Sequence, residues 1–262
     1  MSVGFLAADW PAPVSIRAGT TLRAGGVSAP PFDSLNLGDR TGDDAAAVAA
    51  NRDRLRAELA LPGAPAWLYQ VHGTRVVDAD AAVAGEADAS VGAATSTVCA
   101  VLTADCLPVL FCDREGTCWG AAHAGWRGLA AGVLEATVAA SPAAPERLLA
   151  WLGPAIGAHN FEVGAEVRAV FCDHWADDAV AFTPAAAPGK HLADIYALAR
   201  ARLRRAGVVS VHGGGLCTID DPERFYSYRR SPRTGRMASL VWSVGLRLRE
   251  NGPAAAWLRY RP

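Results

Sequence analysis

The amino-acid sequence predicts a single α/β domain with mixed β-sheets, extending over residues 1–262. Two observations lead to this fold class. Segments rich in apolar and β-branched residues interleave with segments of helical composition, but without the regular strand–helix–strand rhythm of a Rossmann domain. The chain is also 51% hydrophobic and free of internal repeats at a fixed period, so it contains enough apolar side chains for one substantial core.

The first half of the chain predicts a helix followed by two strands. Residues 43–63 have helical composition, and Asp43 or Asp44 can cap the first turn. AWLYQVHG at 66–73 predicts a strand that ends at a histidine and a glycine. STVCAVLTA at 96–104 predicts a buried strand, because its residues are apolar and β-branched.

The second half predicts a hairpin and then alternating elements. LPVLFC, the turn signal DREG and TCWGAAHA favour a β-hairpin between residues 107 and 124. Helical composition or periodicity marks three later segments, at 128–141, 164–175 and 191–207. LLAWLGPAIG at 148–157 predicts a strand that leads into a loop, and MASLVWSVGLRL at 237–248 predicts the last strand.

The composition excludes several classes of protein. A formal net charge of −1 lacks the basic excess of a dedicated nucleic-acid binder. The start of the chain has no basic region followed by a long apolar core, and no apolar run approaches the ~20 residues of a membrane helix. The six cysteines are scattered, unlike those of a disulfide scaffold. We therefore expect a cytoplasmic protein without nucleic acid or membrane as partner.

The predicted hairpin brings a cysteine and a histidine together. If DREG forms a four-residue turn, its centre lies between Arg114 and Glu115, and Cys106 then faces His123 on the other strand. Cross-strand partners have Cβ atoms ~4.5–5.5 Å apart, which lets a thiolate and an imidazole touch or share a metal. The same register places Cys112 and Cys118 on different faces, so we expect no disulfide between them.

His72, which also stands at the end of a predicted strand before a glycine, is the natural third member of this group. Two histidines and one cysteine match a catalytic zinc site, which takes three protein ligands and leaves one position open. The same residues also match a Cys–His nucleophile pair with a second, orienting histidine. The spacing of Cys106, His72 and His123 does not decide between a metal site and a nucleophile.

Two groups of arginines are candidate anion-binding residues. Arg127 lies in Trp126-Arg127-Gly128, where a helix is expected to begin, so free backbone N–H groups and a guanidinium converge there. The second group belongs to YRRSPRTGR at 228–236 and includes Arg229 and Arg230. Arginines in such a loop bind phosphate or stack on a base, although most such loops are simply solvated.

Several long motifs resemble those of the YfiH family, which is also called laccase-domain or polyphenol oxidase-like. They occur in the family's order over nearly the whole chain: QVHGTRV, TADCLPVLF, HAGWRGLAAGV, GPAIGAHNFEVG and FYSYRRSPRTGRMA. The resemblance implies a layered α/β/β/α fold shared with the catalytic domain of cytotoxic necrotizing factor. It also implies a zinc site whose ligands are His72, Cys106 and His123.

The same resemblance implies a function. Family members are described as purine nucleoside phosphorylases of broad range, acting on adenosine, inosine, guanosine and methylthioadenosine, with adenosine deaminase activity as well. One departure from the family is visible at His159-Asn160, where many members have a pair of cysteines. This departure puts in doubt a role for those cysteines but leaves the proposed zinc ligands intact.

Three alternative functions are left open. Copper-dependent oxidation of phenols would suit a His₂Cys centre, but its usual weak axial methionine has only Met237 as a candidate besides the first residue, and none of the six histidines forms an H-x-H pair. A metal-free hydrolase would use Cys106 as nucleophile and His123 as base. A non-enzymatic protein would use the same groove to bind a nucleotide.

Overall fold

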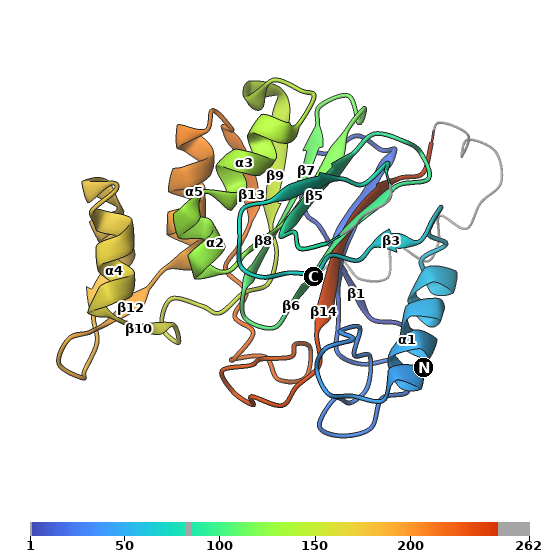
Figure 1. Cartoon of the computed structure of the whole chain (residues 1–262), viewed down its shortest axis with the longest axis horizontal. Coiled ribbons are helices and arrows are strands. Elements are labelled where there is room, and N and C mark those ends of the chain that lie inside the picture. The colour runs from blue at the N-terminus through green and yellow to red at the C-terminus, as the bar shows by residue number, and fades with distance from the viewer. Residues whose placement is uncertain (1, 82–84, 246–262) are drawn as a thin grey trace.

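The structure, a computed structural model, describes residues 2–81 and 85–245 (Figure 1). Two β-sheets lie face to face, and each carries helices on its outer side. The order of layers is helix α1, a five-stranded sheet, a six-stranded sheet, and then helices α2, α3 and α5. This arrangement confirms the expected α/β fold with its four layers and mixed sheets.

The five-stranded sheet separates α1 (Ala45–Glu58) from the second sheet. Successive residues of its strand β6 face opposite sides: Val98 and Ala100 pack toward α1, whereas Cys99 and Val101 pack between the sheets. Its order is β1-β2-β14-β6-β3. The bounds are β1 (Phe5–Ala7), β2 (Ile16–Thr21), β14 (Met237–Ser243), β6 (Val98–Thr103) and β3 (Pro65–Ala66).

The six-stranded sheet forms the centre of the molecule and carries the predicted hairpin. Leu110 of this hairpin faces the first sheet, while Leu107 and Val109 face the outer helices. Its order is β13-β9-β7-β8-β5-β4. The bounds are β13 (Ser210–Gly213), β9 (Leu148–Leu152), β7 (Leu107–Asp113), β8 (Trp119–Ala124), β5 (Ala89–Gly92) and β4 (Val76–Asp78).

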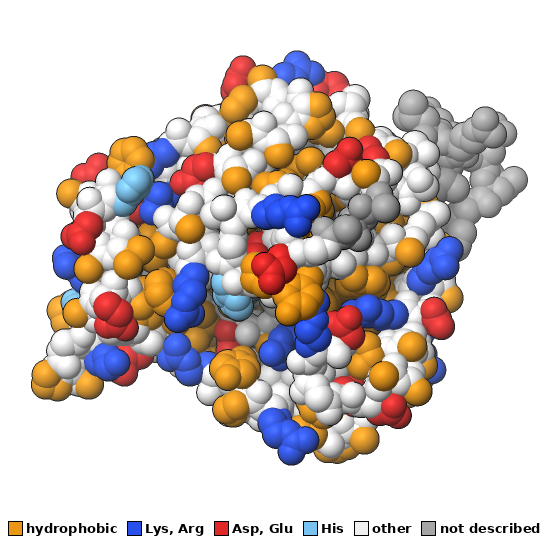
Figure 2. Space-filling view, in the orientation of Figure 1, with side chains coloured by type: hydrophobic (Ala, Val, Ile, Leu, Met, Phe, Trp, Pro, Cys, Tyr) orange, Lys and Arg blue, Asp and Glu red, His pale blue; other side chains and the backbone are white. Residues whose placement is uncertain are grey.

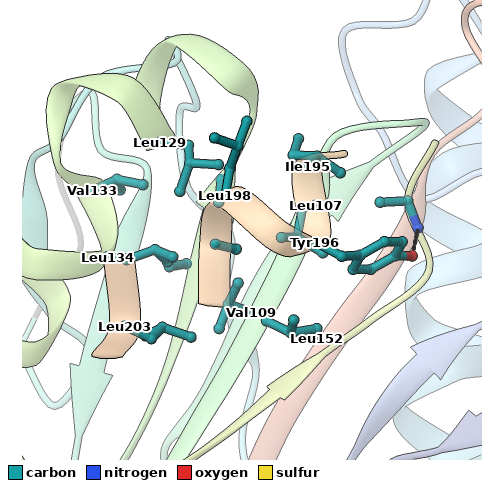
Figure 3. Close-up of a cluster of buried hydrophobic side chains, with 14 of the residues drawn as sticks. Leu107, Val109, Leu129, Val133, Leu134, Leu152, Ile195, Tyr196, Leu198 and Leu203 are labelled. Atoms are coloured by element: carbon teal, nitrogen blue, oxygen red, sulfur yellow. Dashed lines mark hydrogen bonds between the residues drawn. The ribbon is translucent and has the colours of Figure 1, made fainter. Parts of the chain in front are cut away.

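Three helices cover the outer face of the six-stranded sheet (Figure 3). They are α2 (Trp126–Ala131), α3 (Val133–Ala140) and α5 (Ile195–Arg205). Leu134 of α3 and Leu198 of α5 are buried against Val109 of the sheet. Burying a leucine side chain fully contributes about 1.5–3 kcal/mol, so this cluster holds the helices on the sheet.

A smaller three-stranded sheet lies beside α4 (Ala165–Cys172). It consists of β10 (Glu162–Gly164), β12 (Lys190–Ala193) and β11 (Phe182–Pro184), in that order. Two short 3₁₀ helices, Pro145–Arg147 and Ala176–Ala181, complete the described elements. No helix in the described ranges is both long and apolar enough to cross a lipid bilayer.

Three predicted elements differ from the structure. The strand expected at 66–73 is confined to Pro65–Ala66, and the rest of that segment is irregular except for a bridge at Tyr69. The helix expected at 128–141 is two helices, because Gly132 at φ 101° adopts a left-handed conformation between them. The helix expected from residue 191 begins at Ile195, because the preceding residues form β12 and Asp194 caps the helix. Residues 246–248 of the predicted last strand lie outside the described residues.

Candidate active site and metal centre

The structure brings together His72, Cys106 and His123, the three residues predicted from the sequence. The Sγ atom of Cys106 lies 3.7 Å from Nε2 of His72, and the two imidazole ring centres are 4.7 Å apart. One candidate ligand atom from each residue lies within 4.8 Å of the other two, so the group can hold a metal ion. His123 is buried, Cys106 is partly exposed and His72 is exposed, which leaves one side of the group open.

The hairpin reaches this arrangement by a different register from the predicted one. Its turn lies one residue later, because Asp113 still pairs with Cys118 and its carboxylate accepts the N–H groups of Thr117 and Cys118. His123 therefore faces Pro108 rather than Cys106. The error shifts the pairing by two residues, which preserves the face of each side chain and makes Cys106 a diagonal neighbour of His123.

Asp88 holds the loop that presents His72. Its buried carboxylate accepts the backbone N–H groups of Val71 at 3.1 Å, His72 at 2.9 Å and Gly73 at 2.7 Å. These bonds support His72 at φ 63°, a left-handed conformation that non-glycine residues rarely adopt. The sequence analysis missed Asp88, whose only signal is a carboxylate at the entrance to the apolar strand β5.

Asp88 also positions His123. Its Oδ1 atom accepts a hydrogen bond from Nδ1 of His123 at 2.8 Å, which leaves Nε2 of that ring for Cys106 or a metal. Burial favours the neutral forms of both Cys106 and His123. The attraction between the charged forms of the two groups, together with hydrogen bonding, outweighs this effect of burial. The pKa of Cys106 is thereby lowered to about 6, and that of His123, which also gains from Asp88, is raised to about 9. Without a metal, the two groups form a thiolate–imidazolium pair.

Gly125 makes room for the close approach of two ligands. A Cβ atom at this position would lie 2.7 Å from Cδ2 of His72 and 2.9 Å from Sγ of Cys106, which is closer than real contacts allow. The first glycine of the HAGWRG motif is therefore required by the site. Residue 125 also precedes α2, so the turn from β8 into that helix passes directly over the predicted metal ligands.

Asp105 anchors the segment that presents Cys106. It adopts φ 87°, and its carboxylate accepts the hydroxyl of Thr218 and the backbone N–H of Arg229, both at 2.6 Å. Ile156 donates its N–H to the backbone carbonyl of Asp105 at 2.9 Å. Three separate loops thus meet at the residue before the cysteine.

The three candidate ligands open into a cavity of about 560 Å³. Figure 2 shows histidine atoms in a hollow on this face, with basic side chains around it. Arg127, Arg229 and Arg236 line the cavity, and so does Arg40, which the sequence analysis did not single out. The cavity therefore combines a potential metal centre with several cations.

The predicted anion-binding arginines have different surroundings. The guanidinium of Arg127 stacks on Trp126, 4.4 Å from the ring centre, and Arg127 is one of the residues that line the cavity. Arg229 also borders the cavity and donates to the carbonyl of Glu162 at 3.1 Å. Arg230 is not among the residues lining the cavity, and its guanidinium donates to the carbonyls of Thr218, Ile219 and Phe225. Arg127 and Arg229 are thus the better placed of the three to reach a ligand.

Met237, the candidate axial ligand for copper, is fully buried in a separate apolar cluster with Phe225 and Tyr226. Its sulfur accepts the backbone N–H of Tyr226 at 3.0 Å. Met237 is also not among the residues that line the cavity. Its sulfur is therefore already engaged in the core.

Comparison with known proteins places the chain in a family. Residues 17–244 match the family described as "Multi-copper polyphenol oxidoreductase laccase". The chain belongs to this family. The resemblance that the motifs indicated is thereby confirmed.

Two named relatives align with this chain over almost the full length of both proteins. The chain is 58% identical over 238 residues to "Purine nucleoside phosphorylase PA4543" of Pseudomonas aeruginosa, covering 91% of this chain and 98% of that protein. It is 52% identical over 238 residues to "Purine nucleoside phosphorylase YfiH" of Escherichia coli, covering 90% and 97%.

Solved structures share the fold. Protein NMB0706 of Neisseria meningitidis has a TM-score of 0.89 at 52% identity, covering 92% of this chain and all of the other. YlmD of Geobacillus stearothermophilus has a TM-score of 0.83 at 29% identity, covering 92% and 96%.

Proposed function

We propose that this protein is a zinc-dependent purine nucleoside phosphorylase of broad range, which also deaminates adenosine. The expected substrates are adenosine, inosine, guanosine and methylthioadenosine. The observation that carries the proposal is the position of His72, Cys106 and His123 on a cavity lined by arginines. The printed names of the relatives support the phosphorylase activity. Zinc, the breadth of the substrate range and the deaminase activity are our own inference.

The donor set fits zinc. Two imidazoles and a thiolate are ligands that Zn²⁺ takes in catalytic sites, with a fourth position left for water or substrate. The hydrogen bond from His123 to Asp88 is the outer-shell contact that such histidines usually make. Bound zinc would act as a Lewis acid and lower the pKa of a water molecule toward about 7.

The chain's own residues would bind and orient the other reactants. At about 560 Å³, the cavity falls within the ~300–1,000 Å³ typical of small-molecule sites. In phosphorolysis, phosphate forms a bond to the anomeric carbon of the ribose while the purine leaves with the bonding electrons. Arg127 and Arg229, which line the cavity, would hold that phosphate, since arginine–phosphate contacts are charge-assisted and often bidentate. Phe161 and Tyr228, which also line the cavity, offer aromatic faces to the base.

The copper oxidase named in the family description is a weaker candidate. A blue-copper centre commonly adds a weak axial methionine to His₂Cys, and the sulfur of Met237 is engaged with Tyr226 instead. A multicopper centre would also need further histidines, and the sequence has six, none paired as H-x-H.

A metal-free cysteine hydrolase is a second candidate function, and one specific arrangement of side chains favours it. The carboxylate of Asp88 hydrogen-bonds and orients the imidazole of His123, and a ring nitrogen of His123 lies within 4.8 Å of the Cys106 sulfur. This arrangement has the geometry of a nucleophile, a base and an orienting acid. The same geometry serves a zinc site equally well, so activity after metal removal separates the two.

Product analysis together with elemental analysis tests the proposal. Protein purified without chelator is incubated with inosine or adenosine, with and without phosphate, and the bases and sugars are identified. We expect about one zinc bound at the His₂Cys site, and formation of hypoxanthine and ribose 1-phosphate from inosine only when phosphate is present. Adenosine should give inosine in either buffer.

Full activity in metal-free protein would favour the cysteine hydrolase, and tightly bound copper would favour the oxidase. Stable nucleoside binding without turnover would favour the non-enzymatic binding protein.

A further inference from the structure

A second group of metal-ligating side chains lies outside the cavity lining. It consists of His159, Cys217 and Asp220, whose candidate ligand atoms all lie within 4.8 Å of one another. They come from two loops, one after β9 and one after β13. The loops are joined by a bridge between Ala155 and Cys217 and by the hydrogen bond from Thr218 N–H to the Ala155 carbonyl.

Hydrogen bonds already converge on the centre of this group. Nε2 of His159 lies 2.6 Å from Oδ2 of Asp220, and Nδ2 of Asn160 donates to Oδ1 of the same carboxylate at 2.7 Å. The Sγ atom of Cys217 accepts the N–H of Gly157 at 3.2 Å and a second N–H from Asn160 at 3.3 Å. The side chains of His159 and Asp220 are 68% and 47% exposed, so an ion from solvent can reach them.

We propose that His159, Cys217 and Asp220 form a second binding site for a divalent transition metal, with zinc as the natural occupant. A thiolate and an imidazole select zinc or cobalt over magnesium and calcium, which prefer all-oxygen sites. On binding, the Cys217 thiol loses its proton to solvent and its sulfur bonds to the cation. The carboxylate of Asp220 completes three protein ligands and leaves a fourth position for water.

The geometry requires only a small adjustment. Zinc–ligand distances of about 2.0–2.3 Å place tetrahedral donor atoms roughly 3.3–3.7 Å from one another. The contact between His159 and Asp220 must therefore open from 2.6 Å as the ion replaces the hydrogen bond between them. The exposure of both side chains permits that movement.

An isolated ion pair does not account for the whole group. An exposed His–Asp pair is worth little in stability and has no need of a thiol. Here the sulfur of Cys217 points into the same cluster and accepts two N–H groups, from Gly157 and Asn160. A cation is the partner that a thiolate, a carboxylate and an imidazole share.

Occupancy of this second site would fix one wall of the cavity. Ile156 and Phe161 both line the cavity, and His159 lies on the short loop between them. A cation would clamp that loop to the loop that carries Cys217 and Asp220. The ion would therefore be structural, acting at a distance from the His72–Cys106–His123 site.

Metal counting with the metal alone as probe tests the proposal. Metal-free protein is dialysed against limiting free Zn²⁺, and against Co²⁺ to record the thiolate-to-cobalt absorption. We expect two equivalents in the unmodified protein and one in His159→Ala or Cys217→Ser. The matched controls are His174→Ala and Cys172→Ser, which remove the same residue types from positions outside the cluster and should keep two equivalents.

The result stays interpretable if the first site fails to bind metal. In that case the unmodified protein would bind one equivalent, and His159→Ala or Cys217→Ser would bind none. Cobalt binding to the Cys106→Ser variant should keep a thiolate absorption, which the Cys106→Ser, Cys217→Ser double variant should lose. Unchanged stoichiometry and unchanged cobalt absorption in both His159→Ala and Cys217→Ser would overturn the second site.

Discussion

The Oδ1 atom of Asp88 lies 2.8 Å from Nδ1 of His123, and the same carboxylate accepts the backbone N–H of His72 at 2.9 Å. One buried side chain thus positions two candidate ligands that are far apart in the sequence. Through the first contact it orients an imidazole ring, and through the second it stabilises a left-handed backbone conformation. The order of the site depends on this carboxylate as much as on the ligands themselves.

Replacing Asp88 with asparagine should weaken metal binding without removing a ligand. The neutral amide is a poorer acceptor for His123 and for the loop N–H groups, so we expect zinc affinity to fall about 10–100-fold. The free energy of unfolding should fall by about 1–3 kcal/mol, because buried donors lose a charged acceptor. Competition with a chromophoric chelator and thermal denaturation measure the two effects.

Asp80→Asn is the matched control for this change. Asp80 also accepts backbone N–H groups, from Ala93 and Ala94, but it belongs to a different loop. The Asp80→Asn variant should leave zinc affinity unchanged. Equal loss of affinity in both variants would mean that Asp88 acts only through general stability.

Cys106→Ser should lose most of the zinc bound at the His72–Cys106–His123 site, because a weak neutral ligand replaces a thiolate. Cys172→Ser, which changes a partly exposed cysteine on α4, should retain it. Elemental analysis of both proteins after gel filtration gives the comparison. A Cys106→Ser protein with full zinc content and no activity would identify the cysteine as a nucleophile instead.

Gly125→Ala should disrupt the metal centre through sterics alone. The added methyl would lie 2.7 Å from His72 and 2.9 Å from Cys106, so one of these side chains must move. We expect loss of the zinc held by His72, Cys106 and His123, and a stability decrease of about 1–3 kcal/mol, as for other overpacked positions. Gly73→Ala is the control, because its methyl would meet Asp88 at an ordinary 3.5 Å. Normal zinc content in Gly125→Ala would contradict the close approach of the ligands.

The metal-free protein should show an unusually reactive cysteine. Burial alone would raise the pKa of Cys106, but the charge of His123 and hydrogen bonds from both histidines lower it to about 6. The thiolate therefore forms as pH rises through about 6, well below the ordinary value of 9.0. His123 keeps its proton until pH rises through about 9, so the charged pair persists between these limits.

Alkylation by iodoacetamide, followed at the Cys106 peptide by mass spectrometry, measures this pKa. The rate should rise with a midpoint near pH 6 in metal-free protein, and the midpoint should move upward in His123→Asn. A midpoint near 9 in unmodified protein would show that the two groups do not form an ion pair.

Local sequence patterns were sufficient to predict many of the elements. Asp44 caps α1 as its position suggested, and the apolar run at 98–103 forms the strand β6. Such a run indicates a strand buried on both faces but carries no information about its neighbours. The four-layer order was therefore available only from the resemblance to a family.

Contacts between distant residues explain what the sequence analysis missed. The segment around His72 has the composition of a strand, yet Asp88, 16 residues later, captures its backbone N–H groups and bends it into a loop. His159 was noted only as a departure from the family pattern, because its partner Asp220 lies 61 residues away. The grouping of His72, Cys106 and His123 was predictable because a hairpin places two of these residues, Cys106 and His123, close together even when the register is shifted by two residues.

Arg127 lines the cavity, and its guanidinium stacks on Trp126 at 4.4 Å from the ring centre. If its guanidinium holds phosphate, Arg127→Ala should raise the apparent KM for phosphate in inosine phosphorolysis, by roughly tenfold or more for the loss of a charged hydrogen bond. Adenosine deamination, which consumes water instead, should change much less. Steady-state rates at varied phosphate give the first value and ammonia release gives the second.

Arg204→Ala is the control for this test, since it removes an exposed arginine of α5 that is not among the residues lining the cavity. Both activities should be unaffected in that variant. Equal loss of both activities in Arg127→Ala would mean that this arginine shapes the shared pocket rather than binding phosphate. An unchanged KM for phosphate would make Arg229 the candidate phosphate ligand, since it lines the same cavity and can be tested in the same way.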